Sequence, residues 1–357
     1  MCLFVVSALS ANAQSMSIKR DERLIFYPAI AQRIPGSNAW RMELRGSIFE
    51  PERRSASLWL LREMLDLGDV HLSASEEKIF KERTRLFLVD HERGKHIRAL
   101  FGLETFALGK SGVDGEFSSE IVLSDNLIHN CLVGDGGSAC IGFKAALPAA
   151  DQRAFRGEAF LLEETGLSVI SDVDDTIKIT QVSDRKKMMR NTFAKEFEPA
   201  PGMAKLYQRL AREQGAQFHY MSASPWQLYE PLAAFMTQRG FPSGTFSLKE
   251  FRWKNNHAFS LFVDPEKYKP TVIEPLLKQF PKRRFILIGD SGERDPEIYA
   301  ALARKFPGQI ERIYIRNVTG EPADAARYQK VFTGLPPGLW QVFTRPEELA
   351  LPEPRSQ

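Results

Sequence analysis

Acidic side chains follow two apolar runs that lie far apart in the chain. Residues 168–176 read Ser-Val-Ile-Ser-Asp-Val-Asp-Asp-Thr, and residues 284–295 read Arg-Phe-Ile-Leu-Ile-Gly-Asp-Ser-Gly-Glu-Arg-Asp. Carboxylates that crowd at a strand end repel one another and shift each other's pKa unless a cation neutralises them. Hard cations such as Mg²⁺ bind oxygen ligands. Two such strands side by side would place three or four acids around one Mg²⁺, which predicts a phosphoryl-transfer site.

From about residue 166 the chain alternates between strand-length apolar runs and helical segments. The predicted strands are Leu167–Ser171, Phe218–Met221, Phe285–Ile288 and Ile310–Ile315, and the predicted helices are Gly202–Glu213, Pro225–Arg239, Pro270–Phe280 and Pro296–Phe306. Nearly unbroken apolar strands that alternate with helices predict an α/β fold, with a parallel sheet covered by helices on both faces. Ligands of such sheets bind at the carboxyl ends of the strands, where both acidic clusters fall.

The chain before this region predicts a β-rich domain over residues 21–165. Its predicted strands are Leu24–Tyr27, Trp40–Phe49, Arg85–Val89, His96–Leu103, Phe117–Leu123, Cys140–Ala146 and Phe155–Leu162. Residues 56–67 have the apolar spacing of an amphipathic helix. We find no catalytic constellation in this domain, and its role is not predicted.

The composition is that of a globular protein. Among 357 residues, 26% are charged and 43% hydrophobic, and the formal net charge of +3 does not indicate nucleic-acid binding. Residues 1–14 carry no charge and end in small residues, so residues 1–16 are interpreted as a signal peptide, although a basic start is missing. We therefore expect a periplasmic or secreted protein, or a cytoplasmic one if this segment is not a leader. Residues 346–357 form a polar tail after the domain at 166–345.

Two cysteines would remain after removal of such a leader. Cys131 and Cys140 flank the Gly-rich segment at residues 134–138. A disulfide between them is one interpretation, because a turn between two short strands could bring the thiols together in an oxidising compartment. Two free buried cysteines are the alternative.

The acidic motifs resemble those of the haloacid dehalogenase superfamily. Its four motifs are matched by Asp-Val-Asp-Asp-Thr at residues 172–176, by Ser222 at the end of a strand, by a lysine near residue 269, and by Gly-Asp-Ser-Gly-Glu-Arg-Asp at residues 289–295. More narrowly, residues 155–320 are similar to the actin-patch-protein type of phosphatidate phosphatase, through SDVDDTIK, PAPGMAKLY, FHYMSASPWQLY and KRRFILIGDSGERDPEIY. The resemblance implies a Rossmann-like sheet with a small cap.

The resemblance also implies roles for the aspartates. Asp172 would attack phosphorus and form an aspartyl-phosphate, while Asp174 would protonate the leaving alkoxide and later activate water. The Asp172 carboxylate, the Asp174 main-chain carbonyl and Asp290 would hold Mg²⁺, and Asp295 would support that shell. Thr176 would steady the loop around the phosphate.

Several residues have competing interpretations. Ser222 is predicted to donate a hydrogen bond to phosphate, whereas Ser224 begins the pattern Ser-Pro-Trp-Gln and is predicted to cap a helix. Lys269 precedes Pro270 and is the predicted cation beside the phosphate, with Lys267 as an open alternative. Asp295 also precedes a proline, so helix capping competes with its metal-supporting role.

Residues 241–268, between the second and third motifs, would form the cap that the resemblance implies. They are rich in aromatic and cationic residues, including Phe251 and Trp253. Exposed aromatic residues beside Lys and Arg suit the edge of an anionic bilayer, so peripheral membrane contact is one interpretation. The alternative is that these aromatic residues form the core of the cap. A second basic stretch, at residues 185–187, follows the first motif.

The sequence thus favours a Mg²⁺-dependent phosphatase that converts phosphatidate to diacylglycerol and phosphate. The residue chemistry supports the phosphatase, and the resemblance supplies the lipid. One alternative is the same mechanism acting on a soluble phosphomonoester. Another is a non-catalytic scaffold that keeps the fold, and the presence of both Asp172 and Asp174 argues against it.

Overall fold

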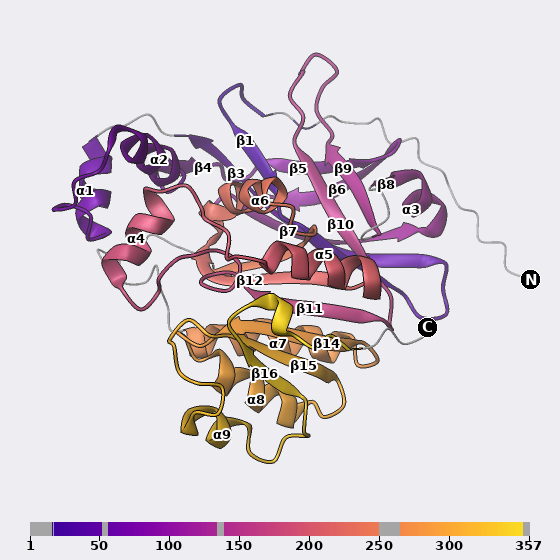
Figure 1. Cartoon of the computed structure of the whole chain (residues 1–357). Coiled ribbons are helices and arrows are strands. Elements are labelled where there is room, and N and C mark those ends of the chain that lie inside the picture. Colours follow the sequence, from indigo (N-terminus) through magenta and orange to yellow (C-terminus); the bar gives the residue numbers. More distant parts are fainter. Residues whose placement is uncertain (1–15, 17, 52–55, 134–138, 250–264, 353–357) are drawn as a thin grey trace, which may run out of the picture.

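The computed structural model describes residues 16, 18–51, 56–133, 139–249 and 265–352 (Figure 1). The interpretation of residues 1–16 as a leader therefore lies outside the described residues except at Met16, which is buried. The interpretation of the aromatic residues between positions 250 and 264 also lies outside them. Among the helices that are described, none combines the length and the apolar character that crossing a bilayer requires.

A six-stranded parallel sheet, here called sheet B, carries both acidic motifs. Its order is β13 (Gly244–Lys249), β12 (Gln217–Pro225), β11 (Leu167–Asp172), β14 (Arg284–Asp290), β15 (Ile310–Arg316) and β16 (Trp340–Phe343). The chain builds outward from β11 in one direction and then returns to build outward from β14 in the other. β11 and β14 are therefore neighbours at the point where the strand order reverses, which is the usual ligand position in such sheets.

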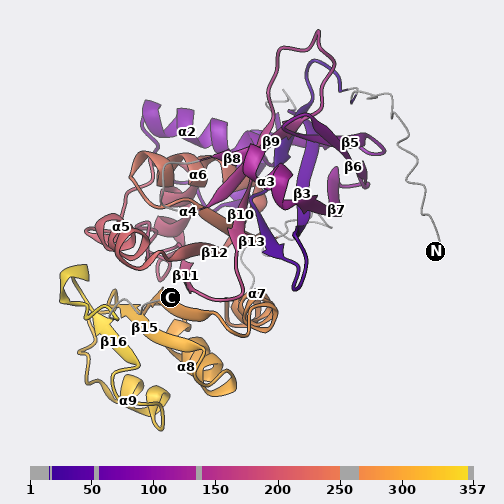
Figure 2. The ribbon, with the colours of Figure 1, turned by 90° about the vertical axis from the view of Figure 1, so that its right-hand side faces the viewer.

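Helices cover both faces of sheet B (Figure 2). One face packs against α4 (Arg185–Phe193), α5 (Met203–Gln214) and α6 (Tyr229–Gln238), and the other packs against α7 (Pro265–Gln279), α8 (Asp295–Lys305) and α9 (Ala326–Phe332). Successive strand residues face opposite sides, so Val169 lies in the first core and Ile170 in the second. The predicted parallel sheet between two helical layers is confirmed.

The N-terminal part forms a mixed sheet, here called sheet A. Its strands are β1 (Arg23–Phe26), β2 (Ala29–Arg33), β3 (Ala39–Pro51), β4 (Val89–His91), β5 (His96–Phe101), β6 (Glu104–Lys110), β7 (Glu116–Ser124), β8 (Leu132–Val133), β9 (Cys140–Ala145) and β10 (Arg156–Leu162). The described helices of this part are α1 (Ala56–Met64), α2 (Ala74–Arg85) and α3 (Asp125–Cys131). Cys131 and Cys140 are both buried and free, which agrees with the second of the two interpretations left open by the sequence.

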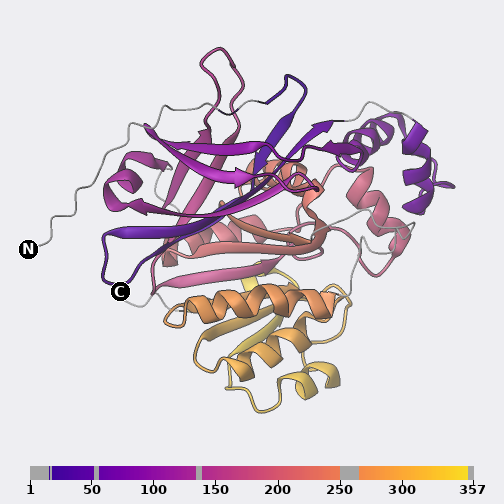
Figure 3. The same cartoon turned by 180° about the vertical axis from the view of Figure 1, so that it is seen from behind.

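Sheet A packs directly on the helical layer of sheet B. Tyr27 stacks on Trp226 with ring centroids 4.0 Å apart, and Arg23 donates to Glu230 on α6 at 2.9 Å. Leucines 65, 67 and 72, around α1 and α2, share one core with α4 and α5. Figure 3 shows α1, α2 and α4 gathered at one end of the molecule. The two sheets are therefore joined through a common core.

Four predictions about local structure are wrong. Of the predicted strand Arg85–Val89, Arg85 is the last residue of α2, residues 86–88 form a turn, and only Val89 lies in a strand, β4. Helix α2 starts at the capping box that Ser73 and Glu76 form. Pro270 lies inside α7, which begins at Pro265. Residues 244–249, assigned to the cap, are strand β13. Ser224 lies in β12 and makes no helix-capping bond.

Candidate active site

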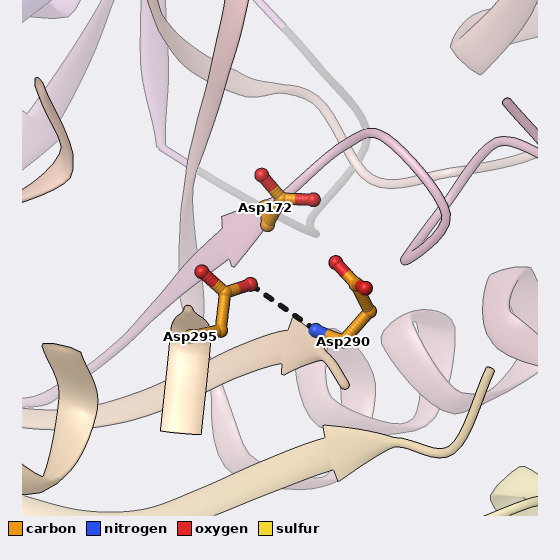
Figure 4. A group of neighbouring side chains, drawn as sticks. All are labelled: Asp172, Asp290 and Asp295. Atoms are coloured by element: carbon orange, nitrogen blue, oxygen red, sulfur yellow. Dashed lines mark hydrogen bonds between the residues drawn. The ribbon is translucent and has the colours of Figure 1, made fainter. Parts of the chain in front are cut away.

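Three aspartates converge where β11 and β14 end (Figure 4). Asp172 is the last residue of β11, Asp290 is the last of β14, and Asp295 is the first of α8. One carboxylate oxygen from each lies within 4.8 Å of the other two, and all three residues are buried. The main-chain N–H of Asp290 donates to Oδ2 of Asp295 at 3.1 Å. The predicted meeting of the two acidic motifs is therefore observed.

Two buried oxygens in this cluster have no hydrogen-bond partner among the described residues: Oδ2 of Asp172 and Oδ2 of Asp290. A buried carboxylate oxygen without a partner is costly, because it has lost its water. Both oxygens of Asp295 already accept hydrogen bonds, from Lys269 and from the Asp290 N–H. The set therefore fits a hard divalent cation held by Asp172 and Asp290, with Asp295 in a supporting position.

The local fold brings Asp295 close to β14. A Cβ atom built on Gly289 would lie 2.1 Å from Oδ2 of Asp295, a distance that no side chain tolerates. The glycine before Asp290 is therefore required by the approach of the Asp295 carboxylate.

Arg327 on α9 holds the loop that follows Asp290. It donates to the main-chain oxygens of Ser291 and Glu293, at 2.8 Å each, and also to the carboxylate of Glu297.

Lys269 is the cation within the cluster. It is fully buried on α7, and its Nζ lies 3.0 Å from Asp172, 2.8 Å from Glu293 and in contact with Asp295. Burial would lower the pKa of Lys269, but the neighbouring carboxylates raise it well above its usual range. Lys267 is exposed. The structure therefore brings Lys269, rather than Lys267, to the cluster.

Burial governs the protonation of the cluster acids. It raises the pKa of Asp172 well above the usual range, and the charges of Asp295, Glu293 and Asp290 add to this while Lys269 opposes it. The pKa of Asp290 is raised in the same way, first by burial and then by Asp295. A bound divalent cation favours the ionised forms and would reverse these shifts.

Asp174 lies in a different environment. Its carboxylate accepts hydrogen bonds from Lys178 at 2.8 Å, Thr180 at 2.7 Å and Ser222 at 2.6 Å, and Ser224 lies 3.4 Å away. Burial alone would raise the pKa of Asp174, but the charge of Lys178 and these hydrogen bonds outweigh it and lower the pKa to about 2. Asp174 is therefore ionised at neutral pH.

Lys178 was not identified from the sequence, although it stands four residues after Asp174. Its side chain is 1% exposed, and its Nζ bonds Asp174 and Thr180 and lies 4.9 Å from the ring centroid of Phe197. Glu293 belongs to the quoted motif, yet its contact with Lys269 was also missed. A lysine four residues beyond a motif carboxylate is the signal that was present for Lys178.

Asp175 shapes the first loop. It has a φ of 56°, a backbone conformation that most residues avoid and that aspartate tolerates better than most. Its carboxylate accepts three main-chain hydrogen bonds, from Thr180, Gln181 and Val182, at 2.7–2.8 Å. These bonds explain why an aspartate suits this position. Thr176, beside it, is fully buried, and its Oγ1 has no partner among the described residues.

The two serines have different surroundings. Ser224 lines a cavity of about 30 Å³ together with Asp172, Asp174 and Glu293, and residues of the α4 region complete its wall. Ser222 instead gives its hydroxyl hydrogen to Asp174 and accepts from the Ser224 N–H at 2.9 Å. Phosphate binding by Ser222 stays a prediction, and Ser224 is the serine that faces the cavity.

The comparisons with known proteins agree with these motifs. A family model described as the catalytic domain of phosphatidate phosphatase APP1 matches residues 167–317. Phosphatidate phosphatase APP1 of Saccharomyces cerevisiae is 36% identical over 168 residues, which cover 46% of this chain and 28% of that protein. An uncharacterized protein of Schizosaccharomyces pombe is 29% identical over 206 residues, covering 56% of this chain and 33% of that protein. The chain thus spans about a third or less of both relatives.

Two solved structures overlap parts of this chain. A haloacid dehalogenase-like structure from Burkholderia xenovorans overlaps 51% of this chain and 94% of that chain, with 10% identity and a TM-score of 0.31. A ferredoxin-NADP⁺ reductase from Plasmodium falciparum overlaps 83% and 95%, with 12% identity and a TM-score of 0.20. Both scores are too low to support an argument about fold or function. The matched residues, 167–317, contain the motifs and the aspartate cluster described above, so this part of the chain is similar to phosphatidate phosphatase APP1 catalytic domains.

Proposed function

We propose that this protein is a Mg²⁺-dependent phosphatase that hydrolyses phosphatidate to diacylglycerol and phosphate through an aspartyl-phosphate on Asp172. One observation carries the chemistry: Asp172 and Asp290, from different strands, meet, and each has one buried oxygen without a partner among the described residues. The lipid substrate is taken from the named activity of the Saccharomyces cerevisiae relative.

In the first half-reaction, a carboxylate oxygen of Asp172 bonds to phosphorus as the bond from phosphorus to the glycerol oxygen breaks. Lys269, 3.0 Å from Asp172, offsets the negative charge that gathers on the phosphoryl oxygens. When bound, Mg²⁺ would hold Asp172 in its ionised form and neutralise charge on the transferring group. Asp172 and Asp290 would hold the ion, and Asp295 would orient Lys269 and Asp290 around it.

In the second half-reaction, water attacks the phosphorus of the aspartyl-phosphate and gives a proton to Asp174, which releases phosphate and restores Asp172. The ionised Asp174, with a pKa lowered to about 2, is ready for this step. Protonation of the leaving alkoxide in the first half-reaction requires that Asp174 first take up a proton, which the ion pair with Lys178 opposes. The resting protein therefore supports the role of base more directly than that of acid.

The test is phosphate release from phosphatidate and from a panel of soluble phosphomonoesters, with Mg²⁺ and after its removal by a chelator. We expect the wild type to release phosphate from phosphatidate only with Mg²⁺, and Asp172→Asn to lose at least about 10⁴-fold in rate. Activity on soluble esters with none on phosphatidate would contradict the lipid substrate. Inactivity of a correctly folded wild type on every ester would contradict the phosphatase itself.

A further inference from the structure

Helix α1 exposes two adjacent large apolar side chains. Trp59 is 68% exposed and Leu60 is 48% exposed, whereas Trp40 and Trp226 are buried. Single exposed apolar residues are ordinary on protein surfaces, but an exposed tryptophan beside a leucine on one helix concentrates apolar area in one place. Leu103, 99% exposed at the turn between β5 and β6, is an isolated case and offers a comparison.

The fold holds α1 firmly. Leu61 and Leu65 are buried, and the Arg62 side chain bonds Glu77 on α2 at 2.5 Å and the main-chain oxygens of Leu67 and Val70. Since these contacts fix the buried side of α1, Trp59 and Leu60 are presented on a rigid element. A rigid apolar surface loses little conformational entropy when it docks.

Helix α4 lies next to α1 and adds positive charge. Arg185, at its start, pairs with Asp66 just beyond α1 at 2.5 Å, and Lys186 and Lys187 are exposed. Lys187 reaches Asp184 at 3.3 Å, an exposed pair that water and salt screen strongly. We call Trp59, Leu60, Lys186 and Lys187 the α1–α4 patch. Figure 1 shows α1 and α4 at the same end of the molecule, and the Arg185–Asp66 ion pair joins the start of α4 to the residues just after α1.

The patch borders the active site. Met188 and Thr192 of α4 line the cavity that also contains Asp172 and Asp174, together with Val182 from the loop before α4. One helix thus forms a wall of the cavity and carries the two exposed lysines one and two residues before Met188. A molecule that contacts Lys186 and Lys187 therefore lies on the helix that forms part of the wall of this cavity.

We propose that the α1–α4 patch docks on the surface of an anionic lipid bilayer, with Trp59 and Leu60 entering the interface and Lys186 and Lys187 contacting lipid phosphates. Tryptophan and leucine beside lysine are the residue types that interfacial helices use. This inference rests on the proposed function, because phosphatidate is an anionic lipid that an enzyme must reach in its membrane. Docking through the patch would bring the lipid headgroup close to the cavity that α4 lines together with Asp172 and Asp174.

The test compares Trp59→Ser/Leu60→Ser with the matched control Leu103→Ser. All three positions are exposed, so folding should survive, which unfolding temperatures would verify. Flotation uses vesicles of phosphatidylcholine alone, of phosphatidylcholine with phosphatidate, and of phosphatidylcholine with phosphatidylserine, in an Asp172→Asn background that cannot consume the lipid. We expect both anionic vesicle types to bind the wild-type surface, the double variant to bind roughly ten-fold more weakly, and the control to bind normally.

Charge reversal, in Lys186→Glu/Lys187→Glu, tests the other half of the patch. Each lysine near an anionic surface is worth about 1 kcal/mol, so loss of the two positive charges alone should weaken binding by about 30-fold at low salt. The two added negative charges should weaken it further, and the whole effect should be smaller at high salt. A second readout is tryptophan fluorescence: the wild type should shift to the blue on anionic vesicles by more than Trp59→Phe does. Equal shifts in the two proteins would overturn the placement of Trp59 in the interface.

Activity separates this inference from the proposed function. In the active enzyme, Trp59→Ser/Leu60→Ser should turn over phosphatidate in vesicles roughly ten-fold more slowly, yet keep normal rates on a phosphatidate with acyl chains short enough to dissolve as monomers. Normal vesicle turnover by the double variant would overturn the docking surface and leave the phosphatase standing. No turnover of any ester by the wild type would refute the proposed function, while vesicle flotation would still test whether the patch binds lipid.

Loss of a dimer in the double variant, with vesicle binding unchanged, would assign the patch to a second copy of the chain and overturn lipid docking.

Discussion

Asp172 and Asp174 leave the same strand two residues apart, yet the protein surrounds them in opposite ways. Asp172 sits among other carboxylates with one oxygen unpartnered, and burial raises its pKa. Asp174 sits among donors, and Lys178, Ser222 and Thr180 lower its pKa to about 2 although it is also buried. Burial alone therefore does not decide the charge of a carboxylate, because the neighbouring groups do.

The difference separates two kinds of site. The Asp172 cluster contains Lys269, yet two of its carboxylate oxygens have no hydrogen-bond partner among the described residues. Oxygens left free in this way are what a cation site needs before its ion is bound. The Asp174 pocket is already complete, with a lysine in place of an external cation. Breaking the complete pocket should cost stability, while changing the incomplete cluster should alter its response to Mg²⁺ and pH.

The largest effect on stability is expected from Lys178→Met. It leaves the ionised Asp174 without its partner, and removal of one member of a buried ion pair costs about 3–5 kcal/mol of unfolding free energy. Denaturant unfolding measures this loss. Adding Asp174→Asn should recover much of the stability, since the unpaired charge is then gone. Equal stability of Lys178→Met and the wild type would show that the pocket does not depend on the lysine.

Gly289→Ala is expected to disrupt the cluster. The new Cβ would collide with Asp295, so the contacts of Asp295 with Lys269 and the Asp290 N–H must shift. Misplacement of catalytic groups by about 1 Å can cost roughly 10²-fold in rate, and we expect a loss of this size in phosphate release. The control is a double-mutant cycle with Asp295→Ala. If Gly289→Ala costs as much without the Asp295 carboxylate as with it, the proposed collision is not the cause.

The pH dependence of stability should distinguish the two carboxylates. Because the folded metal-free protein raises the pKa of Asp172 and Asp290, it binds more protons than the unfolded chain at pH values above about 4. Their contribution to the free energy of unfolding is therefore fully present below the unfolded pKa and is lost as pH rises through the folded pKa values. Each tenfold increase in proton affinity on folding is worth about 1.4 kcal/mol of this free energy. Asp174 behaves oppositely, since its contribution is present above its unfolded pKa and is lost only as pH falls towards about 2.

Unfolding temperatures between about pH 5 and about pH 8, with and without Mg²⁺, measure this dependence. We expect stability without metal to fall as pH rises, Mg²⁺ to restore it, and Asp290→Asn to flatten the slope and lose the response to Mg²⁺. A slope that Asp290→Asn leaves unchanged would argue against crowded carboxylates as its source.

The smallest effects are expected at the two serines. Ser222→Ala removes the 2.6 Å hydrogen bond to Asp174, and a hydrogen bond to a charged group is worth about 1.5–3 kcal/mol. Ser224→Ala removes only a 3.4 Å contact and should change stability little. Since Ser224 lines the cavity, its substitution should act on KM for the phosphate ester instead. The reverse assignment, with Ser222→Ala affecting KM alone, would restore the role predicted from the sequence.

Much of sheet B could be predicted because its inner strands are buried on both faces. The runs at residues 167–171, 218–221, 285–288 and 310–315 all lie within observed strands. Strands β13 and β16 were missed, because they lie at the edges of the sheet, where the apolar pattern is weaker. The resemblance misled the interpretation of residues 244–249, which it assigned to a cap although they pair with β12.

The candidate site divides in the same way. Asp172 and Asp290 could be found because each follows a recognisable strand. Lys269 was found through the order of the motifs, although it lies inside α7 and not at its start. The position of Lys178 could not be predicted. Lys178 reaches Asp174 because the loop between them folds back, and the hydrogen bonds that Asp175 accepts hold this loop. The surroundings of Ser222 and Ser224 could not be predicted either, because β12 continues to Pro225 instead of ending at Ser222. Long-range pairing at a strand end is readable from sequence, whereas the path of a loop is not.

The most direct test of the account is to locate the phosphoryl group during turnover. The enzyme would be mixed with phosphatidate and Mg²⁺, quenched in acid within a turnover, digested, and analysed by mass spectrometry. We predict a phosphorylated peptide with the modification on Asp172, absent without Mg²⁺ and absent in Asp172→Asn. Phosphoryl transfer to another side chain, or steady turnover in Asp172→Asn, would contradict the central claim that the β11 and β14 tips form one phosphoryl-transfer site.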